Sequence, residues 1–196
     1  KKLSKTRIEN VSSLESKIKD TLVFLGMPNV EFKINIKTNV EMLTENGIDE
    51  VVFMFSANKN VSLQPIANIA SGGEMARLML TIKSLLSEKR SLPTIIFDEI
   101  DTGIGGEVAV AVGHHLKNLA KNKQILCITH LASIAVYADN QLKICKSLVE
   151  GKTQTAVDYI TDEKRVEEIA RMLSGDSDSS FSIEHAKAML QNYGGM

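Results

Sequence analysis

Cysteine, aromatic side chains and excess charge are all scarce in this sequence. Of its 196 residues two are cysteine and 5% are aromatic, tryptophan is absent, and the formal net charge is −1. A charge so close to zero gives no general attraction to nucleic acid or to an anionic membrane. So few aromatic residues argue against a platform on which single-stranded bases would stack. Any contact with DNA therefore needs a local patch or a part of the protein outside this sequence.

Long apolar runs and a secretory leader are also missing. No apolar run reaches the ~18 residues that a membrane-spanning helix needs, and no apolar segment of a signal peptide follows the charged N-terminus. We therefore expect no membrane partner. Cys127 and Cys145 stand in apolar, strand-like segments, which predicts small buried thiols in a reducing compartment, with a disulfide as the less favoured alternative. The sequence starts with lysine, which we interpret as the sign of a fragment or of a processed chain.

The glycine-rich loop that would wrap a nucleotide phosphate is missing too. Residues 151–153 read Gly-Lys-Thr, like the end of a P-loop. Such a loop needs an earlier glycine and a following helix, but Lys146 occupies the position of that glycine. The segment that follows, residues 153–160, alternates apolar and polar side chains, which is typical of a strand. We predict a hairpin turn here, and no other segment supplies a P-loop.

The N-terminal part of the sequence predicts a helix followed by a β-hairpin. Residues 2–25 carry apolar side chains at every third or fourth position, the pattern of an amphipathic helix. This helix is either the stump of a coiled coil or an ordinary helix packed on the domain. Residues 30–37 and 50–56 have the pattern of strands, and Asn46-Gly47 between them favours a turn.

From about residue 70 the predicted helices and strands alternate. The strands at residues 94–97 and 124–129 are continuous apolar runs, as expected when helices cover both faces of a parallel sheet. The pattern predicts an α/β fold with a mostly parallel sheet. The other elements we expect are helices at 74–87, 106–120 and from 131, strands near 140–147 and 153–160, and helices near 163–173 and 180–192.

Two adjacent carboxylates, Asp98 and Glu99, end the first of these apolar strands. Ligands of α/β proteins collect at the carboxyl ends of strands. One carboxylate there could hold Mg²⁺, mostly through water, and the other could orient or deprotonate an attacking water. Asp101 adds a third acidic side chain. The alternative interpretation is a solvated acidic turn.

A glycine pair opens the predicted helix near residue 74. Ser71 suits an N-cap, and Gly72 and Gly73 would let the backbone approach a ligand closely. The free N–H groups and positive dipole end of such a helix form an anion site. The alternative is an ordinary capped helix start.

His130 ends the second apolar strand. If the two strands are parallel neighbours, it lies at the same sheet edge as Asp98 and Glu99, where an imidazole could donate a hydrogen bond to a terminal phosphate. The alternative is a surface or capping histidine. The other histidines fall within predicted helices without the spacing of metal ligands: His114, His115 and His185.

In order and spacing these segments resemble the C-terminal lobe of an ABC-type ATPase head, a P-loop NTPase-like fold. Residues 71–74 resemble the signature motif, residues 95–99 the Walker B strand with its catalytic glutamate, residues 101–103 the D-loop, and His130 the switch histidine. Residues 69–74, 97–104, 127–131 and 168–175 are further similar to the RecN family of SMC-like ATPases. In that family residues 1–25 would end a coiled-coil arm, and residues 26–196 would form the lobe.

The resemblance implies an ATP site shared between two heads of a homodimer. Asp98 would help to place Mg²⁺, Glu99 would polarise the attacking water, and His130 would contact the γ-phosphate. The missing N-terminal lobe of the same protein would supply the P-loop. The residues that would bind the nucleotide of the opposite head are Ser71, Gly72, Gly73 and Glu74, with Asp101 acting across the same interface.

The implied function is DNA double-strand break repair and recombination in the bacterial cytoplasm, on the nucleoid. The implied partners are the missing lobe, a second head and DNA, and we expect this chain alone neither to bind ATP tightly nor to hydrolyse it. Two alternatives remain open. One is the head of another SMC-type chromosome-structural ATPase, and the other is an inactive binding module with the shape of an ATPase.

Overall fold

The computed structural model describes residues 1–41, 43–69, 72–89, 92–98, 100–149, 152–175 and 179–194. It forms two compact units, residues 1–92 and residues 93–196, and each is described by itself. The elements of the first unit are α1 (Lys2–Phe24), β1 (Glu31–Thr38), β2 (Asp49–Ser56), β3 (Gln64–Pro65), a short 3-10 helix (Ile66–Asn68) and α2 (Gly72–Lys89). The elements of the second are β4 (Thr94–Phe97), α3 (Gly106–Ala120), β5 (Gln124–Cys127), α4 (Ala132–Ala135), β6 (Gln141–Val149), β7 (Lys152–Ile160), α5 (Asp162–Ser174) and α6 (Ser180–Tyr193).

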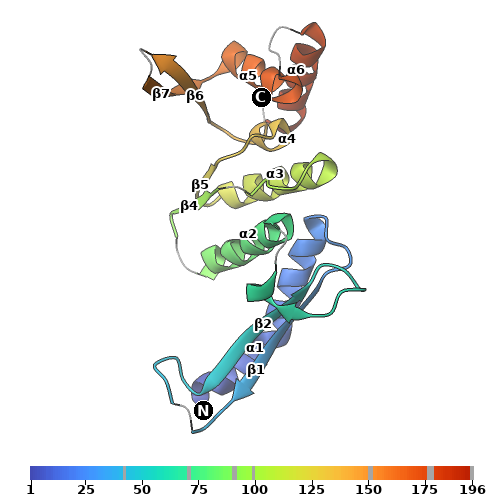
Figure 1. Ribbon diagram of the computed structural model, residues 1–196, viewed down its shortest axis with the longest axis vertical. Helices are drawn as coiled ribbons and strands as arrows, with labels where there is room; N and C mark the ends of the chain where they lie inside the picture. The colour runs from blue at the N-terminus through green and yellow to red at the C-terminus, as the bar shows by residue number, and fades with distance from the viewer. Residues whose placement is uncertain are drawn as a thin grey trace. The chain divides into compact units, whose positions relative to one another are not determined.

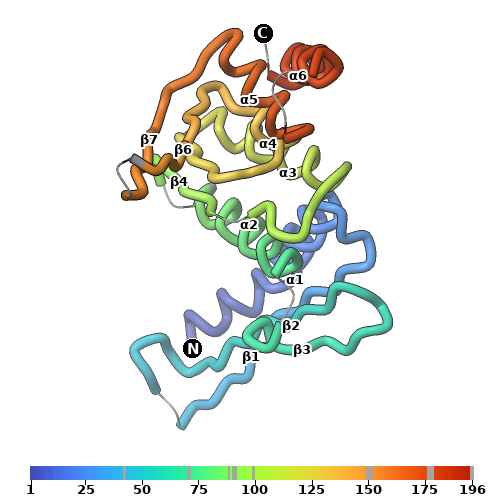
Figure 2. Tube along the Cα trace, turned by 45° about the horizontal axis from the view of Figure 1, so that its top comes forward, coloured from blue at the N-terminus to red at the C-terminus, as the bar shows by residue number. Residues whose placement is uncertain are grey.

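In the first unit a helix packs on an antiparallel sheet of order β1-β2-β3. Alternation along β1 turns Phe32 and Ile34 inward, and α1 contributes Ile18 and Leu22 to the same core. The helix lies along the β1–β2 hairpin (Figure 1; Figure 2). The predicted amphipathic helix and hairpin are therefore confirmed.

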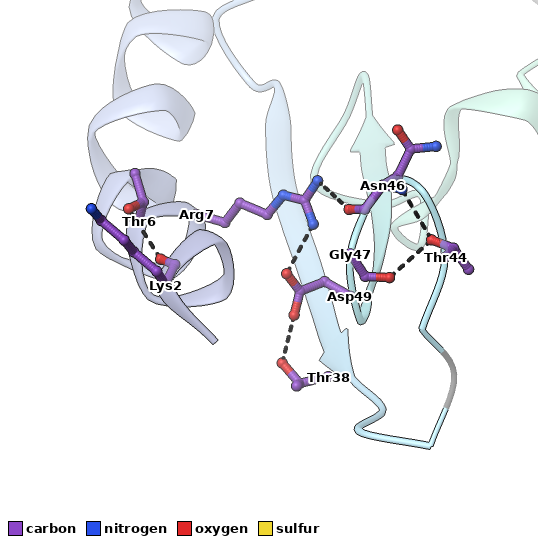
Figure 3. Close-up of polar contacts among 8 residues, drawn as sticks. All are labelled: Lys2, Thr6, Arg7, Thr38, Thr44, Asn46, Gly47 and Asp49. Carbon is purple, nitrogen blue, oxygen red and sulfur yellow. Dashed lines mark hydrogen bonds and ion pairs between the residues drawn. The ribbon is translucent and has the colours of Figure 1, made fainter.

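A polar contact fastens the N-terminal half of α1 to the loop of the hairpin (Figure 3). The Arg7 guanidinium donates to Asp49 Oδ2 and to the carbonyl of Asn46, each at 2.9 Å. Burial acts to raise the pKa of the Asp49 carboxyl, but hydrogen bonds, that from Arg7 first among them, hold this pKa below its ordinary value. The loop fits closely because Gly47 adopts a positive φ of 97°, a backbone conformation that favours glycine.

The second unit is built on a parallel pair of strands, β4 and β5, which pair from Thr94 with Gln124 to Phe97 with Cys127. The helix α3 connects the two strands, and α4 follows β5. The helices α5 and α6 lie side by side (Figure 1). The apolar core that they share with α4 and the residues directly after it consists of Ala132, Ala135, Val136, Tyr137, Ile169, Ala170, Ala186 and Leu190.

The Gly-Lys-Thr segment belongs to a hairpin, as the sequence predicts. β6 pairs antiparallel with β7, with Val149 opposite Lys152. The Lys152–Thr153 pair therefore starts a strand and not the helix of a P-loop. No helix in the part of the chain that the structure describes is both long enough and apolar enough to cross a membrane.

The expectation that helices cover both faces of the parallel pair is wrong. Ile95 and Phe97 are buried, but on the other face Ile96, Leu126 and Ile128 are 56%, 44% and 52% exposed. These three share that face because side chains alternate along a strand and Ile96 stands opposite Leu126. About half of each of these three side chains is exposed, and we call this apolar group the uncovered row (Ile96, Leu126, Ile128).

The two cysteines are free thiols, and no disulfide joins them. The prediction of free thiols is thus confirmed, but both are half-buried and therefore less buried than the sequence predicts. They are only half-buried because they lie on strands that other elements do not cover on every side. Cys127 ends β5 and Cys145 lies within the β6–β7 hairpin.

Candidate active site

The carboxyl ends of β4 and β5 meet at one edge of the sheet. The two strands run parallel, and the N–H of Ile128 donates to the carbonyl of Phe97 at 2.9 Å, one step beyond the paired residues. Asp98 therefore leaves β4 where Thr129 and His130 leave β5. This confirms the neighbourhood that the sequence predicts for Asp98 and His130.

The carboxylate of Asp101 joins the two strand ends. This residue is only 4% exposed, and its Oδ2 accepts hydrogen bonds from the Thr129 hydroxyl at 2.7 Å and from the His130 backbone N–H at 2.8 Å. The same oxygen lies 2.9 Å from Nδ1 of the His130 imidazole. A single buried oxygen thus fixes both the backbone and the ring of His130.

The ring of His130 faces outward from this anchor. Its side chain is 74% exposed, whereas that of Asp101 is 5% exposed. An ionised carboxylate can only accept hydrogen bonds, so a ring nitrogen beside it carries the proton. Because Nδ1 lies against Asp101, Nε2 is the ring nitrogen left to meet a ligand.

Thr129 is a member of this group that sequence reasoning missed. Its hydroxyl donates to Asp101 and also accepts the N–H of Leu131 at 3.1 Å. It thereby shapes the bend between β5 and α4. A threonine directly after a strand could have indicated this role, because a threonine hydroxyl readily forms a hydrogen bond with the backbone two residues further along the chain.

The carboxylates make this edge of the sheet acidic, and their charge affects the pKa of the Cys127 thiol at the end of β5. Burial raises the pKa of the Cys127 thiol to about 12, and the charges of Asp101 and Asp98 add to the effect. The thiol therefore stays protonated and is not a nucleophile. Asp98 itself is exposed, so its carboxylate fits a Mg²⁺ ion that keeps part of its water shell.

The other predicted site residues lie elsewhere or outside the described residues. Gly72, Gly73 and Glu74 form the first turn of α2 in the first unit. Ser71 and Glu99 lie outside the part that the structure describes. Among the described residues no group of three or more histidine, cysteine, aspartate and glutamate side chains could hold a metal ion.

Comparison with known proteins places the chain in a family. No family model matches it. The sequence is 41% identical to the DNA repair protein RecN of Treponema pallidum, over 96% of this chain and 34% of that protein. The chain spans about a third of the length of the curated RecN relatives it matches.

Solved structures share the fold at lower identity. One is the Smc head domain with a coiled coil and joint from Pyrococcus yayanosii, with a TM-score of 0.65 and 18% identity over 84% of this chain and 29% of that chain. Another is described as showing ATP-driven dimerization and DNA stimulated activation of SMC ATPases, with a TM-score of 0.57 and 17% identity over 82% of this chain and 91% of that chain. The fold is that of an SMC-type ATPase head, and by its identity to RecN proteins over nearly its whole length the chain belongs to the RecN family.

Proposed function

We propose that the chain forms the C-terminal half of an ATP-hydrolysing head in a RecN protein that acts in DNA double-strand break repair and recombination. The observation that carries this proposal is the meeting of Asp98, Asp101 and His130 at the carboxyl ends of two parallel strands. Phosphoryl transfer depends mainly on positioning and charge stabilisation. These side chains could position the reacting groups, and Mg²⁺ held by Asp98 would supply the neutralising charge. The names of the relatives supply the link to DNA repair.

Each site residue has a role in this proposal. Asp98 would help to hold Mg²⁺, which neutralises phosphate charge, and Glu99 would orient the attacking water. His130 would meet the γ-phosphate through Nε2. Ser71 would bind the nucleotide of the opposite head together with Gly72, Gly73 and Glu74, the last three in the first turn of α2. Asp101 would act across the same interface.

Exposed apolar surface supports the proposal that another lobe packs on this chain and completes the head. The uncovered row of the parallel pair is one such surface. A second lies on one face of the β6–β7 hairpin, where cross-strand pairs place Leu142 beside Tyr159 and Ile144 beside Val157, all exposed. Leu148 is exposed further along the same face. Contiguous exposed apolar surface of this kind marks an interaction site. We propose that the N-terminal lobe of the same protein, with its P-loop, covers both.

The further parts of the proposal concern the whole protein. Residues 1–25 would end a coiled-coil arm, and residues 26–196 would form the lobe. ATP would close two such heads and hydrolysis would open them, as the ATP-driven dimerization described for SMC ATPases suggests. The proposed place of action is the nucleoid in the bacterial cytoplasm, where the proposed DNA substrate lies.

The decisive experiment measures ATP turnover by this chain alone and by this chain mixed with the N-terminal part of its own protein. We expect no turnover from the chain alone, because half a site cannot position the phosphates. The mixture should hydrolyse ATP, and linear double-stranded DNA should be tested for stimulation. Glu99→Gln should lower kcat by a factor on the order of 100 or more, since it removes the group that orients water.

The matched control is Glu167→Gln, the same chemical change at an exposed position of α5. It should leave turnover unchanged. Turnover by the isolated chain that disappears in Glu99→Gln would contradict the half-site proposal. A folded mixture that never hydrolyses ATP would favour an inactive binding module instead.

A further inference from the structure

We propose that Asp101 is a positioning residue for His130, an inference that rests on the proposed function. Its carboxylate would hold the imidazole with Nδ1 inward, so that Nε2 is presented to the terminal phosphate of ATP. Asp101 would then act within its own head, in addition to any contact across the head interface.

Burial and hydrogen bonding argue for this role. The Asp101 side chain is 5% exposed, and three donors converge on one of its oxygens: the Thr129 hydroxyl, the His130 backbone N–H and His130 Nδ1. A buried carboxylate is held firmly when its hydrogen bonds are made. These contacts therefore hold the Asp101 carboxylate at the end of β5, where little of it is exposed.

The contact between the buried Asp101 carboxylate and the exposed His130 ring has a use for ligand binding. A flexible, exposed imidazole would sample several orientations, and each lost orientation costs free energy when a ligand binds. The contact to Asp101 limits this sampling before ATP arrives. Small errors in the placement of a catalytic group lower rates on the order of 100-fold, so an anchor of this kind is functionally significant.

The first test uses turnover by the complete protein in a double-mutant cycle. Asp101→Ala should lower kcat by about tenfold to 100-fold with little change in KM for ATP, because the ring is misplaced but the nucleotide still binds. Asp101→Asn keeps an acceptor oxygen and should restore part of kcat. In a His130→Gln background Asp101→Ala should have almost no further effect, since both changes remove the same interaction.

Asp158→Asn is the matched control, because it neutralises an exposed carboxylate of β7. It should leave kcat unchanged. Equal losses from Asp101→Ala in the presence and absence of His130 would overturn the inference and assign Asp101 to another contact, such as one across the head interface. If Asp101→Ala does not fold, Asp101→Asn in the same cycle decides the matter, with additive losses as the contradicting result.

The second test needs no ATPase activity and so separates the two proposals. In the chain labelled with ¹⁵N-histidine, the His130 ring signals, assigned by their loss in His130→Gln, should show the Nδ1 proton that the contact to Asp101 requires. Asp101→Ala removes the acceptor and should shift the ring toward the Nε2–H form. An unchanged tautomer in a protein that hydrolyses ATP would overturn this inference alone. The predicted shift in a protein without turnover would support the contact and count against the proposed function.

Discussion

Gly113 shows how tightly single residues are packed in the second unit. A Cβ added to this glycine of α3 would lie 2.8 Å from Cε2 of the Tyr137 ring, and closer still to Cδ2 of that ring. Tyr137 is itself buried and packs against Tyr193 of α6, with ring centroids 5.2 Å apart. The absence of one methyl group therefore sets how α3, α4 and α6 fit together.

Gly113→Ala should accordingly destabilise the chain by about 1–3 kcal/mol, the usual cost of overpacking. In an ordinary helix the same change would stabilise by about 1 kcal/mol through helix propensity, so the sign of the effect is diagnostic. The measurement is urea unfolding followed by circular dichroism. In a Tyr137→Ala background the clash with the ring is gone and only the Ser133 carbonyl, at 3.1 Å, remains close, so the substitution should cost clearly less. Destabilisation of equal size in both backgrounds would contradict the packing argument.

At the scale of elements, the carboxylate of Glu168 attaches the β6–β7 hairpin to α5. Lys143 of β6 lies 2.7 Å from Glu168 Oε2, and Arg171 donates to the same oxygen at 2.9 Å. Burial acts to raise the pKa of the Glu168 carboxyl, but hydrogen bonds from Arg171 and Lys143 outweigh it and hold this pKa below its ordinary value of 4.5.

This contact makes stability depend on acid pH. Because the pKa of Glu168 is lower in the folded than in the unfolded chain, its contribution is present above pH ~4.5 and is lost as pH falls through the folded pKa. The free energy of unfolding should therefore drop in this window, and Glu168→Gln should flatten the drop while costing on the order of 1–2 kcal/mol at pH 7. Urea unfolding between pH 7 and pH 3 measures both, with Glu167→Gln as the control. An unchanged pH profile in Glu168→Gln would refute this assignment.

The elements themselves could largely be predicted from the sequence. The bounds of β4 and α3 agree with the prediction at both ends, because apolar period and chain length decide between strand and helix. The prediction that both faces of β4 and β5 are buried was wrong. A continuous apolar run predicts two buried faces, but it does not specify which segment covers them, and so Ile96 and Leu126 were expected to be buried.

The candidate site was predictable only in part, for a similar reason. The parallel register brings Asp98 and His130 to one edge, and this follows from the order of the elements. The inward turn of Asp101 depends on its side-chain rotamer and on three donors of Thr129 and His130, which follow β5 almost thirty residues further along the chain. Sequence pattern carries no information on such a contact, and Thr129 was overlooked with it.

At the scale of the whole molecule, the uncovered row (Ile96, Leu126, Ile128) predicts how the chain behaves with and without a partner. Leu126→Asn should weaken association with the N-terminal part by about tenfold, because a buried amide without a partner costs 1–3 kcal/mol. The isolated chain should keep its stability, since Leu126 is exposed there. Calorimetric titration measures the affinity, and Leu173→Asn on α5 is the control. Equal affinities for Leu126→Asn and the unchanged chain would place the partner elsewhere.

The contact between Arg7 and Asp49 has a mechanical consequence. The helix α1 lies along β1, and Arg7 fastens its N-terminal half to the hairpin loop. A pull on the start of this helix would load the loop first and would then act in shear along the strand, where many contacts share the force. The first unit would therefore resist such a pull as one stiff body, because many contacts along the strand must break together before it opens.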